Sequence, residues 1–452
     1  NGTAGRTISH DLGCDPGMII IHSTANNRQG VVWHRGYSST TQGYTYINST
    51  NAEDLSSNLW NSTAPTSSVI TLGTNSLLNS NSETYVAYVF AHNNNDGEFG
   101  PDSDQDIIKC GSYTGNASST GPVVDLGFEP QWLLVKNVST HSNTHWYILD
   151  VMRGWDVGGS GTGTINIKAN NTDVEQAMAL IDPNSTGFQV KSSSSVINGS
   201  GNKMVYMAIR RGPLAVPEDA TKVFDASVTS YSANQRIVSA IDVTDLFMVA
   251  RKPSGTSSNG VYLFSRLTGN RRLRTDQTFG ENAEAGLSGF DTQLGVIAGG
   301  SDSGENVWNG TFIKYFLKRA PGYFDVVNYT GTGSNQNVSH NLTVVPEMMW
   351  IKSKDASHSW AVYHSATGNT GIIYLNSNEA EFSLSGSTVF NNTTPTSSVF
   401  TVGTNNVLNQ STKNFIAYLF ATAPGVSKVG SVSHSGSSTD VDCGFSSGAK
   451  FV

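Results

Sequence analysis

One short apolar stretch occurs twice, as Tyr85-Val86-Ala87-Tyr88-Val89-Phe90-Ala91 and as Phe415-Ile416-Ala417-Tyr418-Leu419-Phe420-Ala421. The copies are 330 residues apart, and the block Pro65–Val69 recurs at 395–399 with the same offset. Apolar residues that alternate with period two, or run on without a break, predict a strand with one or both faces buried. A constant offset over this span indicates a duplicated domain.

Weaker copies of this closing strand occur at 204–210 and 312–318, each followed by a Pro/Gly hinge. Turn residues separate the apolar stretches at the spacing that is typical of sandwiches and barrels. We therefore expect an all-β fold, a tandem array of antiparallel β-sandwich modules of about 100 residues each. Helical pattern is scarce, and Asn170 to Ala179 is the stretch most compatible with a turn or two of helix.

The landmarks predict four modules and the beginning of a fifth. The fourth duplicates the first, and the fifth resembles the second. Because both ends fall inside repeats, with the first clipped at its N-terminal side, we expect a longer gene product. The expected segments are repeat 1 at 1–92, an acidic linker at 93–110, repeat 2 at 111–212, repeat 3 at 223–320, repeat 4 at 323–421 and the truncated repeat 5 at 429–452.

Composition narrows the function classes. Charged residues are 14% of the 452, against roughly 25% in an average soluble protein, and the net charge is −8. This balance disfavours nucleic acid as a partner, which attracts basic surfaces. No apolar run approaches the ~20 residues of a membrane-spanning helix, so we expect no membrane insertion. Three widely spaced cysteines form neither a disulfide framework nor a metal knuckle.

Few residues invite a binding function. Trp60 and Trp155 lie in polar, turn-rich surroundings and are candidates for stacking on sugar rings. Asp102, Asp104 and Asp106 resemble the first half of a Ca²⁺ loop, because hard cations bind several oxygens. The rest of an EF-hand is missing, so a solvated interdomain linker is the favoured interpretation. A Ca²⁺ site is the alternative, and we expect no other cofactor.

Catalytic patterns are weak. His34 and His364 occupy equivalent positions, but neighbouring repeats carry Asp150 and Ser265 there, which favours a structural role. No GxSxG motif or Cys/His constellation marks a nucleophile, so we expect a protein that is not an enzyme. The carboxylate pair of a glycosidase needs only to converge in space, which leaves that class open.

Several stretches resemble a repeat family in structural proteins of marine tailed phages such as cyanophages. The resemblance is carried by Gly100–Asn116, Leu126–Lys136, Met152–Gly154, Ala208–Pro213 and Lys318–Val327. It covers almost the whole chain and implies a virion component, a tail fibre or other tail-associated protein, on the surface of an extracellular particle. It supplies no catalytic motif.

Together these patterns favour a structural and adhesive virion protein that contacts host-surface glycans through repeated β-modules. Expected partners are further copies of the chain, for instance in a trimer, other virion proteins and the host glycan. Repetition adds avidity, since linked weak sites can gain roughly 10²–10⁴ over a single site. The alternatives are a polysaccharide depolymerase and a capsid-surface decoration or spacer protein without a ligand.

Overall fold

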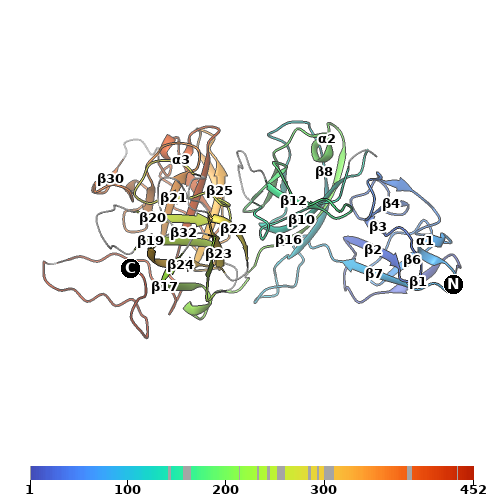
Figure 1. Cartoon of the computed structure of the whole chain (residues 1–452), viewed down its shortest axis with the longest axis horizontal. Coiled ribbons are helices and arrows are strands. Elements are labelled where there is room, and N and C mark those ends of the chain that lie inside the picture. The colour runs from blue at the N-terminus through green and yellow to red at the C-terminus, as the bar shows by residue number, and fades with distance from the viewer. Residues whose placement is uncertain are drawn as a thin grey trace. The chain divides into compact units, whose positions relative to one another are not determined.

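The computed structural model describes residues 2–140, 144–155, 164–212, 214–231, 234–241, 245–251, 260–282, 287–292, 295–299, 310–383, 389–434 and 436–452. The chain forms two compact units, Asn1–Asp150 with Gly159–Arg211, and Val151–Gly158 with Gly212–Val452. Nearly all regular structure is antiparallel strand, which confirms the all-β prediction (Figure 1). In the described part of the chain, no helix is long and apolar enough to cross a membrane.

Two modules make up the first unit, and each pairs a large sheet with a small one. Module 1 has the sheets β5-β4-β3-β2-β7 and β1-β6, and module 2 has β13-β12-β11-β10-β16-β8 and β14-β15-β9. The bounds in module 1 are β1 Arg6–Ser9, β2 Met18–Ser23, β3 Val31–His34, β4 Gly43–Tyr46, β5 Asp54–Leu55, β6 Val69–Leu72, α1 Ser76–Asn79 and β7 Tyr85–Phe90. Those in module 2 are β8 Ile108–Thr114, β9 Val123–Asp125, β10 Pro130–Asn137, β11 Tyr147–Asp150, β12 Thr164–Lys168, β13 Gln176–Met178, β14 Ile181–Asn184, β15 Gly187–Val190, α2 Ser195–Asn198 and β16 Lys203–Arg210.

The second unit repeats this plan. Module 3 has the sheets β17-β24-β19-β20-β21 and β18-β23-β22, and module 4 has β25-β32-β27-β28-β29-β30 and β26-β31. The bounds in module 3 are η1 Ala220–Lys222, β17 Phe224–Tyr231, β18 Arg236–Val238, β19 Leu246–Arg251, β20 Val261–Ser265, β21 Leu273–Arg274, β22 Leu287–Thr292, β23 Gly295–Ala298 and β24 Gly310–Leu317. Those in module 4 are β25 Phe324–Thr330, β26 Gln336–Ser339, β27 Met348–Ser353, β28 Ala361–His364, β29 Gly371–Tyr374, β30 Phe382–Ser383, β31 Val399–Val402, α3 Asn406–Asn409 and β32 Asn414–Phe420.

Two expectations about segments differ from the structure. The expected linker at 93–110 overlaps β8, whose first residue is Ile108. The expected helical turn at 170–179 contains the strand β13 instead, because this short stretch pairs with β12. The truncated repeat 5 at 429–452 stays a prediction.

The large sheets are apolar on both faces. In β32, Phe415, Ala417 and Leu419 pack in the core of module 4. Ile416 and Tyr418 alternate with them and pack in a second core that is shared with module 3. Since side chains alternate across a strand, an unbroken apolar run must be covered on both sides. Module 3 supplies the second cover.

The first unit has the same two-sided burial. Ile19 and Ile21 of β2 pack inside module 1, whereas Met18 packs in a core that contains Leu134 and Met207 of module 2. Each unit is therefore built from two sandwiches whose large sheets share an apolar core. A pair of modules, rather than a single module, is the smallest arrangement that buries both faces.

A lysine–tryptophan pair marks this shared core in both units. Trp146 in module 2 is fully buried, and its indole Nε1 donates a hydrogen bond to the carbonyl of Tyr46 in module 1 at 2.9 Å. Lys136 lies 5.8 Å from the centre of that ring and donates to the carbonyl of Thr144. Burial lowers the pKa of Lys136 to about 7.

Module 4 repeats this pair against module 3. Trp360 Nε1 donates to the carbonyl of Arg274 at 2.7 Å, and Lys352 donates to the carbonyl of Thr278 at 3.0 Å. Both hydrogen bonds connect module 4 to module 3, at the end of the hairpin β20–β21 and in the segment that follows it. The polar ends of two large buried side chains are thus satisfied by backbone carbonyls of the neighbouring module.

Buried asparagines tie modules 1, 2 and 4 together internally. Asn79, at the end of α1, donates from Nδ2 to the carbonyls of Thr3 and Gly73, both at 2.8 Å, and accepts from the amide of Gly2. Asn198 and Asn409 make the corresponding bonds at the ends of α2 and α3. The amide therefore connects the short helix to the chain that leads into the small sheet.

We predict that Asn79→Ala destabilises the first unit by about 2–4 kcal/mol, because it removes the hydrogen bonds of a buried amide and leaves the buried carbonyl of Gly73 without that donor. Urea unfolding of the full chain measures the loss. Asn51→Ala, at an exposed asparagine of the same module, is the matched control and should change stability by less than about 0.5 kcal/mol. Equal effects of the two substitutions would contradict the role of Asn79.

We predict that Trp146→Ala lowers the stability of the first unit by about 3–5 kcal/mol, as expected for a large side chain removed from a core. Trp146→Phe keeps most of the packing and loses the indole hydrogen bond, so it should cost about 1–3 kcal/mol. Urea unfolding at neutral pH separates the two contributions. A loss below 1 kcal/mol for Trp146→Ala would show that the module pair does not depend on this ring.

Candidate functional site

The tryptophans singled out from the sequence are core residues. Trp60 is fully buried, and its indole donates to the carbonyl of Gly43 at 3.0 Å. Trp155 is also fully buried. Neither ring offers a face to a sugar from solvent, so the structure places no glycan site at either residue.

The acidic triplet is not brought together into a ligand set. Asp106 is buried, and its carboxylate accepts hydrogen bonds from the amides of Asn95 at 2.7 Å and Gly97 at 2.8 Å. Asp102 and Asp104 are exposed. Within the described ranges, no three His, Cys, Asp or Glu side chains are grouped so as to hold a metal ion. Asp106 instead fixes the conformation of the loop before β8.

The repeated histidines end strands, as the structural interpretation predicts. His34 ends β3 and is fully buried, where Nδ1 accepts from the amide of Gly36 at 3.0 Å and Nε2 lies 3.0 Å from the carbonyl of Tyr206 in module 2. Burial lowers the pKa of His34 to about 4. His364 ends β28, and its Nδ1 accepts from the amide of Ala366.

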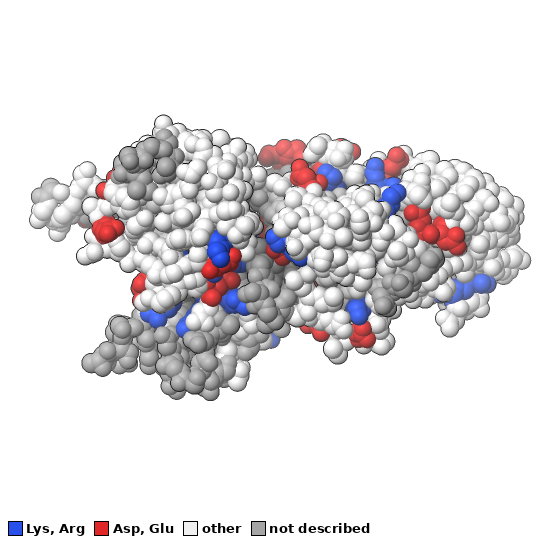
Figure 2. Space-filling model, turned by 90° about the horizontal axis from the view of Figure 1, so that it is seen from above, with Lys and Arg blue, Asp and Glu red and all other residues white. Residues whose placement is uncertain are grey.

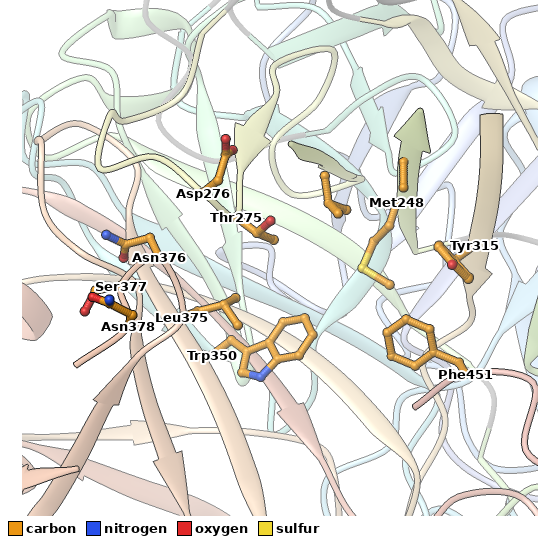
Figure 3. A pocket seen from close by; sticks show the side chains of 12 residues that line it. Met248, Thr275, Asp276, Tyr315, Trp350, Leu375, Asn376, Ser377, Asn378 and Phe451 are labelled. Atoms are coloured by element: carbon orange, nitrogen blue, oxygen red, sulfur yellow. The ribbon is translucent and has the colours of Figure 1, made fainter. Parts of the chain in front are cut away.

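A cavity lies within the second unit, where modules 3 and 4 meet. Its volume is about 570 Å³, which falls in the range of small-molecule sites. Figure 3 shows the side chains around it. Its lining is Met248, Ala250, Val261, Thr275, Asp276, Tyr315, Trp350, Leu375, Asn376, Ser377, Asn378 and Phe451.

The cavity is the counterpart of the site that Trp360 and Lys352 fill. Ile351 and Ala361 are cross-strand partners in module 4, and the corresponding partners in module 3 are Val249 and Tyr262. Val261 thus corresponds to Trp360, and Ala250 corresponds to Lys352. Where module 4 places two large side chains against the hairpin of module 3, module 3 places two small ones against the hairpin of module 4. The difference in side-chain size leaves the cavity.

Aromatic rings form one end of this cavity (Figure 3). The centre of the Trp350 ring lies 4.9 Å from the centre of the Phe420 ring, and this contact within module 4 holds Trp350 in place. Tyr315 contacts Phe451 edge-on with 5.1 Å between ring centres, and Phe451 is 47% exposed. Flat apolar surfaces of this kind bind the face of another ring.

Polar groups form the other end. Asp276 receives two hydrogen bonds from Arg274, from Nη2 at 2.8 Å and from Nε at 3.1 Å. Burial opposes ionisation, but the hydrogen bonds and charge of Arg274 outweigh it and lower the pKa of Asp276. Asn376 accepts from the amide of Trp360 at 2.7 Å, which fixes the amide group at the cavity wall. The carboxylate is thus ionised at neutral pH and presented beside neutral amides.

Sequence reasoning missed this site for a physical reason. Trp350 lies within an apolar stretch that predicts a strand, and this setting indicates a core residue, as it does for Trp132. Val261 and Ala250 are unremarkable in a strand, and they acquire meaning only by alignment with Trp360 and Lys352. A comparison between the repeats could have found the site. The residue just before the aromatic strand is large in modules 2 and 4 and small in modules 1 and 3.

The surface carries little organised charge. On the face shown in Figure 2, most of the described surface is uncharged, and basic and acidic residues lie in small mixed clusters. This agrees with the low content of charged residues in the sequence. An uncharged surface favours contacts by hydrogen bonding and ring stacking.

The family described as domain of unknown function DUF7483 matches the chain twice, over residues 1–213 and 221–449. The chain belongs to this family. Each match spans two modules, so the family's domain corresponds to the module pair that shares one apolar core. No curated protein matches the chain.

We predict that the first unit loses stability as pH falls from about 6.5 toward 4, by at most about 3 kcal/mol for His34. Between these values the unfolded histidine binds a proton and the buried one does not. His92, whose pKa burial also lowers to about 4, acts in the same direction. Thermal unfolding across this pH range measures the slope.

His34→Gln should lower stability at pH 7 and flatten that slope without removing it, because His92 remains. His434→Gln, at an exposed histidine, is the control and should leave the slope unchanged. An unchanged slope in His34→Gln would show that this buried ring does not set the pH dependence.

Proposed function

We propose that the chain is a structural and adhesive virion protein of a marine tailed phage, a tail fibre or tail-associated protein that contacts host-surface glycans. The observation that carries the adhesive part is the cavity of the second unit, where aromatic faces stand opposite amide, hydroxyl and carboxylate groups. That combination suits a sugar ring, which has an apolar face and polar edges. The resemblance to marine phage repeat proteins supports the virion part.

The scaffold suits adhesion. The polar cavity residues follow strands β21 and β29, whose positions are fixed by the shared core of the module pair. Sites held by rigid elements keep their geometry without ordering on binding. Several copies of the chain in one particle, each with this cavity, would provide avidity.

A depolymerase is less well supported. Glycoside hydrolysis uses two carboxyl groups roughly 5–10 Å apart across the bond to be cleaved. Among the described residues that line the cavity, Asp276 is the single carboxylate, and Arg274 holds it as an ion pair. A spacer or capsid-decoration role without a ligand is the remaining alternative, and the binding experiment distinguishes it.

We predict that Val261→Trp abolishes glycan binding, because it places in module 3 the side chain that fills the corresponding position in module 4. The chain already accommodates tryptophan at two such positions, 146 and 360, so we expect the fold to persist. Binding of the labelled full chain to host cells and to an immobilised glycan panel is the measurement. Stability is checked on the same sample by thermal unfolding.

Val228→Trp is the matched control, since Val228 is an exposed valine of the same module outside the cavity. It should bind as the unaltered chain does. If the unaltered chain binds neither cells nor glycans, the spacer role replaces adhesion. If Val261→Trp folds and still binds, the glycan site lies elsewhere.

A further inference from the structure

We propose that the cavity selects a neutral pyranose ring and rejects sugars that carry a carboxylate or sulfate, with Asp276 as the residue that decides between them. This inference rests on the proposed function, in which the cavity binds glycan. It adds the charge class of the sugar and the residue responsible.

The filled counterpart shows what shape the cavity accepts. Trp360 stacks on Tyr418 with 6.2 Å between ring centres and 28° between their planes. Tyr418 pairs with Trp350 in its sheet, and Tyr315 pairs with Met248 at the corresponding position of module 3. Tyr315 therefore faces the cavity as Tyr418 faces the indole. A flat ring of comparable size fits against it.

Asp276 supplies the polar recognition. Its carboxylate can accept hydrogen bonds from sugar hydroxyl groups, and such charge-assisted bonds are stronger than neutral ones. The neighbouring neutral groups on Thr275, Asn376 and Asn378 can exchange further hydrogen bonds with hydroxyls. The hydroxyl groups along the edge of a sugar thus find hydrogen-bond partners along this wall. Asp276 carries the one formal charge among these wall residues.

An anionic sugar finds no compensating charge. None of the described lining residues is Lys, Arg or His. The nearby Arg274 already donates two hydrogen bonds to Asp276. Its guanidinium lies over the ring of Tyr262, 5.3 Å from the ring centre, and the guanidinium of Arg272 lies over the same ring at 5.1 Å. A carboxylate or sulfate in the cavity would lose hydration beside another carboxylate, which is costly without a paired cation.

Asp276 is also the exception among the four modules. Asn48, Asn170 and Asn376 each accept from the amide of the residue that corresponds to Val261, and Asp276 stands at their position. A Cβ on Gly260 would lie 2.0 Å from Asp276 Oδ1, so glycine there leaves space for the carboxylate. Replacing Asp276 with asparagine restores the residue that the other modules carry.

The test compares Asp276→Asn with the unaltered full chain on matched oligosaccharides that differ only at C6. Galactose, glucose and mannose oligomers are set against the corresponding galacturonate, glucuronate and mannuronate oligomers, by calorimetry at two salt concentrations. We expect the unaltered chain to prefer the neutral member of at least one pair by at least about tenfold. Asp276→Asn should weaken neutral binding about tenfold and strengthen uronate binding, because Arg274 then lacks its carboxylate partner.

Asp440→Asn, at an exposed aspartate of the second unit that does not line the cavity, is the control and should leave the ratio of neutral to uronate affinity unchanged. Equal or tighter binding of uronates by the unaltered chain would overturn the inference and leave the proposed adhesion standing. A selectivity ratio that Asp276→Asn does not move would also overturn it. Failure of both sugar classes to bind would refute the proposed glycan contact itself.

Discussion

The structure depends on burying both faces of each large sheet. The strand at 414–420 carries apolar side chains at every position from Phe415 to Phe420, and alternate residues enter different cores. A single sandwich would leave one of those faces exposed to water, at a cost of roughly 25 cal/mol for each Å² of apolar surface. Pairing two modules removes that cost, and the family's domain accordingly spans two modules rather than one.

The shared core also sets how polar groups are placed within it. Lys136 and Lys352 are fully buried, and no described carboxylate is hydrogen-bonded to either ammonium group. Backbone carbonyls nearby accept the hydrogen bonds of these two groups instead. Burial lowers the pKa values of these two lysines to about 7 and about 8. Such groups fix the register of the two modules, because a shifted pairing would leave a buried amine without acceptors.

The interface between modules 3 and 4 is nearly symmetric, and it contains two corresponding contacts. One contact is filled by core side chains, and the other is the proposed glycan site. Both modules of the second unit offer a hairpin end to the neighbouring sheet, in corresponding positions. Trp360 and Lys352 close one of these contacts, whereas Val261 and Ala250 leave the other open. The proposed glycan site therefore needed no new element in the fold. It needed small residues where the other module has large ones, and an aspartate where the others have asparagine.

The class of fold and the repetition could be predicted from the sequence, because strand periodicity and turn spacing are local properties that survive duplication. The sequence also favoured a structural role for His34 and His364. Local pattern failed at 170–179, where pairing with β12 made a strand of a stretch compatible with helix. It also failed at Trp60 and Trp155, where polar neighbours in sequence conceal burial in space.

Where a cavity forms was decided only by the packing of modules 3 and 4. Its lining runs from Met248 in module 3 through Trp350 in module 4 to Phe451, so the cavity exists only once the two modules are paired. Burial and cavities are properties of the assembled surfaces, and no local pattern in the chain encodes which surface will meet which.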